Sequence, residues 1–168
     1  MGGYKFMPGG SGLIVADEIH NRIHLGQFFS SGFIDTSFSN GEIINIGLVL
    51  TRTAHMVFSA QAGVDSLATG YGGAVFSGGT EMLISNHNGH SSKVSGATLY
   101  SLPTVSDPGS ILQQWLIAGG SGNRRTGADI NAFAEFILPP ANYLMRLQNL
   151  TTNTETASLE FNWYEPEA

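Results

Sequence analysis

The chain of 168 residues contains no cysteine. Disulfide frameworks, thiolate nucleophiles and cysteine-type zinc sites are therefore excluded. Charge is also scarce: charged residues make up 12% of the sequence, against roughly 25% in an average soluble domain. Serine, threonine, asparagine, glutamine and glycine must then cover the surface. A surface with so little like-charge repulsion suits a protein that packs against neighbours.

Basic residues and long apolar runs are the other shortages. Seven basic residues face thirteen acidic ones, for a net charge of −6, and only Arg124 and Arg125 are adjacent. Nucleic-acid binding is disfavoured, because it depends on clustered Lys and Arg. The longest apolar runs, such as "LIVA" and "GLVL", are far below the ~18–20 residues of a membrane span. Because "MGGYKFMPGG" is not followed by an apolar signal segment, we expect a soluble protein made in a cytoplasm.

Alternation of apolar and polar residues with a period of two dominates from residue 27 onward. The clearest case is "ASLEFNWYE", in which Leu159, Phe161 and Trp163 share one face. Such alternation is typical of half-buried strands in antiparallel sheets. The expected strands cover residues 28–36, 41–51, 54–60, 80–85, 110–118, 129–138, 142–150 and 157–165.

About eight strands without long helices predict an all-β fold, an antiparallel β-sandwich, with a jelly roll favoured. Of these strands, residues 110–118 read as apolar on both faces. No linker, composition break or repeat divides residues 26–168, so we expect a single sandwich domain there.

Residues 1–25 form a separate N-terminal segment. Four glycines among the first ten residues indicate an irregular arm, which carries the apolar residues Tyr4, Phe6 and Met7. Residues 13–25 fit either a short helix or an extended segment. In a helix, Ile19 and Ile23 would share a face, as would His20 and His24, with Asp17 as N-cap and Gly26 as the end.

The stretch "NHNGHSS" (86–92) is the first candidate for chemistry, because it holds His87 and His90. A metal site needs three or four ligands, which Glu81 or Asp107 would supply only through folding. Asn-Gly is also the strongest two-residue hairpin signal. We therefore favour a polar turn here, and a plain surface pair at His20 and His24.

Other signatures of chemistry are weak. There is no Gly-x-Ser-x-Gly elbow, and "GGSGNRR" (119–125) lacks the Lys and Ser/Thr of a phosphate-binding loop. A glycosidase carboxylate pair at Glu135 and Glu160 stays open, although both fall on faces predicted to be solvent-exposed. The Asn149 glycosylation sequon matters only in a secreted eukaryotic protein. We predict no enzyme, no cofactor and no metal.

Aromatic residues at strand spacing leave two alternatives. Trp115, Trp163, Tyr100 and Tyr143 would form either a platform that stacks on sugar rings or part of the core. The core is favoured, since aromatic residues with strand periodicity are usually buried.

Several motifs, in order, carry a family resemblance. They are "HNRIHLG" (20–26), "FFSSGFIDTS" (28–37), "RTAHMVFSAQ" (52–61), "GGTEMLISNHNGHSS" (78–92), "LYSLPTVSDPGSIL" (99–112), "IAGGSGNRR" (117–125) and the closing "EFILPPANYLMRLQNLT...SLEFNWYE" (135–165). Over most of residues 20–165 the chain resembles the capsid decoration, or cement, proteins of tailed bacteriophages. None of these motifs is a catalytic signature.

The resemblance implies a structural virion protein on the exterior of the capsid, synthesised in the host cytoplasm. Its partners would be the major capsid protein and further copies of itself, as a homo-oligomer with a trimer favoured over a dimer. Candidate capsid contacts are Tyr4, Phe6, Met7, Ile19 and Ile23. Candidate subunit contacts are His87, His90, Arg124 and Arg125. The alternative is a tail- or vertex-associated sandwich that binds carbohydrate or a receptor.

Overall fold

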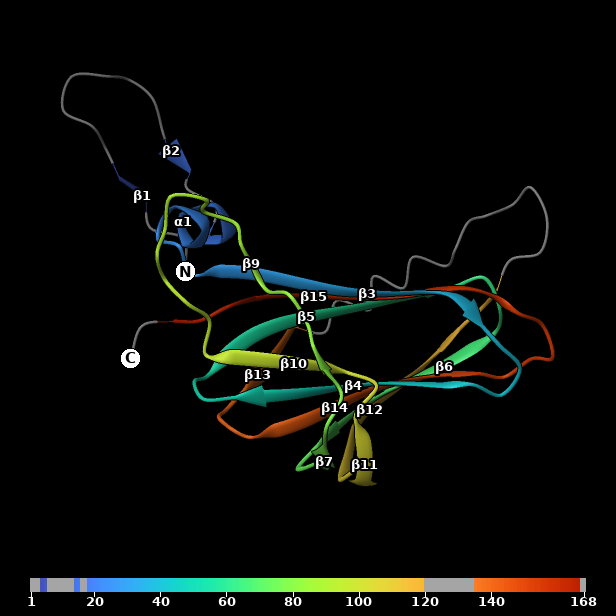
Figure 1. The fold of residues 1–168 in the computed structure, drawn as a ribbon. Coiled ribbons are helices and arrows are strands. Elements are labelled where there is room, and N and C mark those ends of the chain that lie inside the picture. The colour runs from blue at the N-terminus through green and yellow to red at the C-terminus, as the bar shows by residue number, and fades with distance from the viewer. Residues whose placement is uncertain (1–3, 6–13, 16–17, 120–134, 167–168) are drawn as a thin grey trace.

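The computed structural model describes residues 4–5, 14–15, 18–119 and 135–166 (Figure 1). One short helix, α1 (Glu18–His24), precedes the main strands. The strands are β1 (Tyr4–Lys5), β2 (Ile14–Val15), β3 (Phe28–Phe38), β4 (Ile43–Leu50), β5 (Ala54–Ala62), β6 (Ser66–Gly72), β7 (Val75–Ser77), β8 (Thr80–Glu81), β9 (Ser85–Asn86), β10 (Ala97–Ser101), β11 (Thr104–Asp107), β12 (Ser110–Ile117), β13 (Glu135–Leu138), β14 (Asn142–Asn149) and β15 (Glu155–Tyr164).

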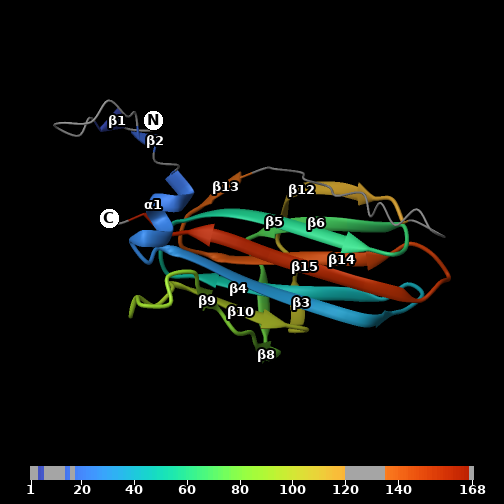
Figure 2. The ribbon, with the colours of Figure 1, turned by 90° about the horizontal axis from the view of Figure 1, so that it is seen from above.

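Two antiparallel sheets pack face to face as a sandwich. One has the strand order β12-β6-β14-β4-β10-β8, and the other has the order β13-β5-β15-β3-β9. Seen from above, β15 lies between β3 and β5, over the strands of the other sheet (Figure 2). Two small sheets, β1-β2 and β11-β7, complete the described part. The prediction of an all-β antiparallel sandwich is confirmed.

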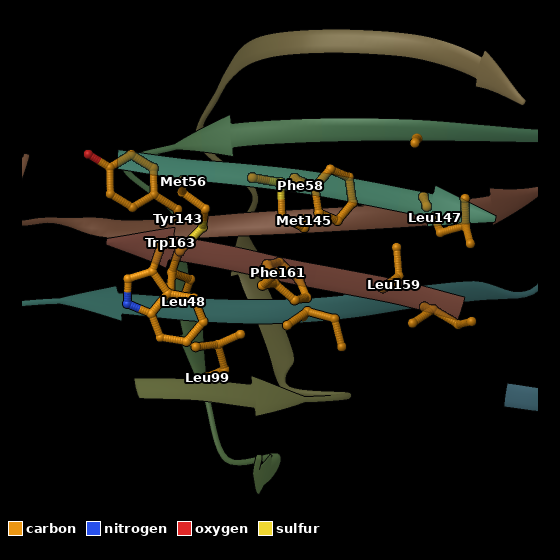
Figure 3. Close-up of a cluster of buried hydrophobic side chains, with 14 of the residues drawn as sticks. Leu48, Met56, Phe58, Leu99, Tyr143, Met145, Leu147, Leu159, Phe161 and Trp163 are labelled. Carbon is orange, nitrogen blue, oxygen red and sulfur yellow. The ribbon is translucent and has the colours of Figure 1, made fainter. Parts of the chain in front are cut away.

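The core lies between the two sheets and is built by the predicted alternation. Leu159, Phe161 and Trp163 of β15 point toward the opposite sheet (Figure 3) and are fully buried. There they meet side chains such as Leu48 and Met145. Burying one such side chain contributes about 1.5–3 kcal/mol to stability, so this alternation defines which face of each sheet turns inward.

The sequence did not predict β6 and β10, two strands of the main sheets, nor the short strands β1, β2, β7 and β11 of the two small sheets. β6 lies between β12 and β14, and β10 lies beside β4. The β6 sequence "SLATGYG" is rich in small and turn-forming residues and shows no polar alternation. The glycine at position 70 has a packing reason, because a Cβ there would lie only 3.2 Å from Met145 Sδ. β6 is therefore a central strand with a turn-like composition.

The strand expected at residues 80–85 is wrong in extent. Only β8 and β9 are strands there, and they belong to different sheets. Met82 and Ile84, between them, pack against the core, while Leu83 is 85% exposed. The segment passes from one sheet to the other and covers the side of the sandwich formed by β3 and β10.

The strand expected at residues 110–118 is present as β12, and its apolar faces are largely not buried. β12 is an edge strand, and Ile111, Leu112 and Leu116 are exposed. Trp115 is half-buried and meets the Phe58 ring edge-on at 5.3 Å. No helix in the described part of the chain is long and apolar enough to span a membrane.

Candidate functional site: the α1 end of the sandwich

The helix α1 stands outside both sheets, at one end of the sandwich (left in Figure 1). It stops where the sequence predicted, at Gly26, whose φ of 66° suits glycine. The Gln27 backbone N–H donates to the Arg22 carbonyl at 2.9 Å, and the Gly26 N–H donates to the Ile23 carbonyl at 2.9 Å. These two bonds form a Schellman cap, which fixes the end of the helix.

The loop "NHNGHSS" holds α1 in place. The Asn88 side chain donates to the His24 carbonyl at 3.0 Å, and the Asn86 side chain donates to the Gly26 carbonyl at 3.1 Å. A Cβ on Gly26 would collide with the Ser91 side chain. The loop therefore supplies hydrogen bonds to the helix end and packs directly on Gly26.

The predicted turn in this loop is present, but it is not a hairpin. Ser91 N–H donates to the Asn88 carbonyl at 2.9 Å, which closes a turn through Gly89 and His90. The strand before the turn, β9, pairs with β3, whereas the strand after it, β10, pairs with β4 and β8. The loop thus connects two sheets rather than two paired strands.

His87 and His90 do not form a metal site with other side chains. His87 Nε2 lies 2.8 Å from Ser30 Oγ, and its ring meets the Phe28 ring edge-on at 4.8 Å. Both histidines are exposed in the single chain. Across the described residues there is no group of three or more His, Asp or Glu that would hold an ion. Arg124 and Arg125 lie outside the described residues.

Of the predicted capsid contacts, Ile19 and Ile23 lie on α1 at this end. Ile19 is 47% exposed, whereas Ile23 is half-buried. Two apolar side chains that the sequence analysis did not single out are also exposed there, Leu25 at 47% and Val94 at 78%. Tyr4 belongs to β1, which pairs with β2. Phe6 and Met7 lie outside the described residues.

A buried carboxylate, Glu165, closes this end of the sandwich. It is 5% exposed. Its Oε1 accepts hydrogen bonds from Ser95 Oγ at 2.5 Å, Gly96 N–H at 2.9 Å and Trp163 Nε1–H at 3.1 Å. Arg52 adds a distant ion pair at 3.8 Å. Because its oxygens are so fully hydrogen-bonded, Glu165 is a structural tie between β15 and residues 95–96.

The alternation in β15 contained a signal for this tie. Trp163 faces the core, and a residue two positions further along a strand faces the same way. A buried carboxylate must be hydrogen-bonded, so Glu165 was predictable as an anchor. Its partners Ser95 and Gly96 were not, because only folding brings them near.

A pocket of about 850 Å³ lies beside Glu165. Its walls include Gly26, Gln27, Arg52, Lys93, Val94 and Pro140. Lys93 and Val94 continue directly from the loop that holds α1. The α1 end of the molecule thus consists of α1, Leu25, residues 86–95 and this pocket.

A second polar cluster, also missed from the sequence, joins β5, β13 and β15. His55 Nδ1 lies 3.0 Å from Glu135 Oε1, and Tyr164 OH donates to the same oxygen at 2.9 Å. The Arg22 guanidinium of α1 lies 5.3 Å from the centre of the Tyr164 ring. Within the described residues, the only hydroxyl hydrogen-bonded to His55 is this phenol. The cluster is therefore not a hydrolytic triad, and its bonds connect the edge strand β13 and α1 to the sheet.

The remaining sequence candidates are structural. Trp163 is fully buried, and Tyr143 OH donates to the Pro139 carbonyl at 2.8 Å. Burial raises the pKa of Tyr143 above its usual value. Trp115 and Tyr100 are half-buried, and no aromatic side chain in the described burial ranges is exposed. Asn149 is 1% exposed, so the asparagine of its sequon is buried. Trp163 and Tyr143 thus belong to the buried core, as the favoured interpretation expected, and Trp115 packs against it.

Glu135 and Glu160 are both exposed, as predicted. Glu135 is engaged with His55 and Tyr164, and neither carboxylate lines the pocket beside Glu165.

Comparison with known proteins gives no relative: no family model, no curated sequence and no solved structure matches the chain.

Proposed function

We propose that this chain is a structural virion protein that binds the outer surface of a tailed-phage head as a homo-oligomer and stabilises the capsid shell. The observation that carries the proposal is the α1 end, where three apolar side chains on segments that belong to neither sheet are exposed: Ile19 on α1, Leu25 directly after it, and Val94 on the loop whose earlier residues hold the helix. Exposed apolar side chains that a partner can cover are typical of protein interaction sites. The motif resemblance of residues 20–165 identifies the kind of partner.

The way α1 is held supports a docking role. Its C-terminus is capped, its last carbonyls accept bonds from Asn86 and Asn88, and Arg22 packs over Tyr164. A surface element fixed before binding loses little conformational entropy when it docks. Such a helix is suited to recognising a rigid, repeated surface such as a capsid lattice.

The strand order supports a jelly roll, which we infer as the finer description of the sandwich. Eight strands divide into the orders β13-β5-β15-β3 and β12-β6-β14-β4. Along the chain, the first four of these alternate between the sheets, and so do the last four. Jelly rolls are common in viral capsid proteins and in lectins, so this supports the proposal only by analogy of fold.

The chain would stabilise the head by mass action. A protein that binds the assembled shell but not its separated subunits shifts the equilibrium toward the shell. Weak contacts repeated through an oligomer then add by avidity. The exposed apolar residues of the edge strand β12 are available for contacts between copies, in a trimer by preference over a dimer.

The experiment compares two matched surfaces on one protein. Heads lacking the protein are mixed with purified wild-type chain or with the double variant Ile19→Glu/Leu25→Glu, and bound protein is measured after sedimentation. We expect affinity to fall at least about tenfold, because each apolar side chain buried in an interface contributes about 1.5–3 kcal/mol.

Leu150→Glu is the matched control. Leu150 is 49% exposed, close to the 47% of Ile19 and Leu25. It directly follows β14, whose C-terminal end lies away from α1 (Figure 2). It should bind heads like the wild type. Equal binding by all three proteins would refute docking through the α1 end. A copy number in purified virions that matches one tail or one vertex, rather than the capsid lattice, would favour the tail-associated alternative.

A further inference from the structure

Two histidines on α1 form a converging pair. His20 and His24 are four residues apart on the helix, and both side chains are exposed. Their Nε2 atoms lie 3.0 Å apart, and their ring centroids lie 4.5 Å apart at an interplanar angle of 79°. Both rings thus direct the same nitrogen toward one point at the surface.

The separation of the two nitrogens fits one class of metal geometry. Two imidazole nitrogens at about 2.1 Å from one ion lie about 3.0 Å apart in adjacent octahedral or tetragonal positions, and about 3.4 Å apart in tetrahedral positions. The observed 3.0 Å therefore matches adjacent positions separated by 90°. Tetragonal nitrogen coordination is typical of Cu²⁺ and Ni²⁺, whereas Zn²⁺ prefers a tetrahedron.

The surroundings of the pair favour binding from solvent. The backbone at His24 is fixed by the Asn88 side chain and by the Schellman cap. A cation that bridges positions i and i+4 would also hold the last turn of α1 in its helical form. The backbone that carries His24 is thus fixed before a ligand binds, while both imidazole rings remain accessible to solvent.

We propose that His20 and His24 form a bidentate site for a divalent transition-metal ion, with Cu²⁺ bound most tightly, Ni²⁺ next and Zn²⁺ least. Both imidazoles bind as neutral ligands through Nε2. No third His, Asp or Glu joins them within the described residues, so water or a group from outside the chain fills the remaining positions. This site is independent of head binding and adds a ligand class to the proposed function.

In the absence of metal, the same geometry is a hydrogen bond between one protonated and one unprotonated nitrogen. The two arrangements differ in a measurable way, because only a metal site gives metal-dependent signals from both rings. The experiment must therefore determine how many imidazole nitrogens bind the ion, as well as the affinity of the chain for that ion.

The test titrates the folded full-length chain with Cu²⁺, Ni²⁺ or Zn²⁺ by calorimetry, and records the Cu²⁺ electron paramagnetic resonance spectrum. Variants are His20→Gln, His24→Gln and the double variant; the control is His87→Gln/His90→Gln, an exposed histidine pair in the same end of the molecule. Circular dichroism confirms that each variant is folded.

We expect the wild type and the control to show a Cu²⁺ signal with two imidazole nitrogens. Each single variant should show one nitrogen and at least about tenfold weaker binding, and the double variant should lose the site. The proposal is overturned if the wild type binds no Cu²⁺, or if His20→Gln and His24→Gln leave the affinity and the nitrogen count unchanged. Tighter binding of Zn²⁺ than of Ni²⁺ at this pair would overturn the adjacent-position geometry.

Discussion

Asparagine side chains bind backbone carbonyls at both ends of the sandwich, but the segments that they hold differ. At the α1 end, the amides of Asn86 and Asn88 hold backbone carbonyls of a helix that lies outside both sheets. At the opposite end, Asn149 donates to the Phe38 carbonyl at 3.2 Å and to the Asn153 carbonyl at 2.9 Å. Its Oδ1 accepts bonds from Thr151 N–H and Oγ.

The difference lies in what each amide holds. Asn149 is buried and connects strand ends of both sheets, so its bonds belong to the folding unit. Asn86 and Asn88 are half-buried and position a surface element. Substitutions that remove these bonds at the Asn149 end should therefore lower the global free energy of unfolding. Substitutions that disturb the loop at the α1 end should loosen α1 and leave the core folded.

The largest expected effect is at the far end. Asn149→Ala removes two donated and two accepted hydrogen bonds, including the buried bond to the Phe38 carbonyl, which costs about 2–4 kcal/mol of unfolding free energy. Urea unfolding measures it. Asn153→Ala, an exposed neighbour in the same turn, should change stability by less than about 0.5 kcal/mol. Similar losses in both variants would contradict the role given to Asn149.

Two glycines with the same backbone angle sharpen the comparison. Gly26 at the α1 end and Gly41 at the far end both have φ of 66°. A Cβ on Gly41 would meet nothing within 4 Å, whereas one on Gly26 would collide with Ser91. Gly41→Ala should then show backbone strain alone, about 1–2 kcal/mol, and Gly26→Ala should add a steric effect.

Hydrogen exchange distinguishes where the effect of Gly26→Ala falls. We expect faster exchange in α1 and residues 86–91, with β4 and β15 unchanged, because the clash separates the loop from the helix. Combining it with Ser91→Gly should restore part of the protection. Equal exchange in Gly26→Ala and the wild type would show that the loop does not hold the helix.

Strands with one buried face and one solvent-exposed face were predictable from the sequence. β15 and β5 alternate, because one side of each meets the core and the other meets solvent or surface polar groups. β6 was missed since its Gly and Thr residues resemble a turn, although Thr69 and Gly70 lie in the middle of a sheet. Periodicity reports which face is buried only when the two faces differ.

The site was less predictable than the fold. Local spacing allowed a helix that ends at Gly26, but it left an extended segment open, and the structure decides for the helix. The Glu165 tie and the Glu135–His55–Tyr164 cluster depend on residues brought together by strand register, with separations such as 70 positions between Ser95 and Glu165. The local sequence pattern does not indicate which distant residues become partners, so these contacts are seen only in the three-dimensional structure.

The smallest expected effect tests whether the α1 end also responds to high pH. Tyr143 is the second residue of β14, at that end, and burial raises the pKa of its phenol. The unfolded chain therefore loses this proton more readily than the folded chain. The resulting stabilisation is fully present below the unfolded pKa of about 10 and is lost as pH rises through the higher folded pKa.

Tyr143→Phe should lower stability at pH 7 by about 1 kcal/mol, through loss of the bond to Pro139. It should also flatten the fall in unfolding free energy above pH 10, because the variant has no phenol to ionise at this position. Urea unfolding at pH 7, 9.5 and 10.5 measures both effects. Tyr100→Phe, at a half-buried tyrosine that packs near Phe76, is the control and should keep the wild-type slope. If Tyr143→Phe also keeps that slope, the alkaline sensitivity does not arise at the α1 end.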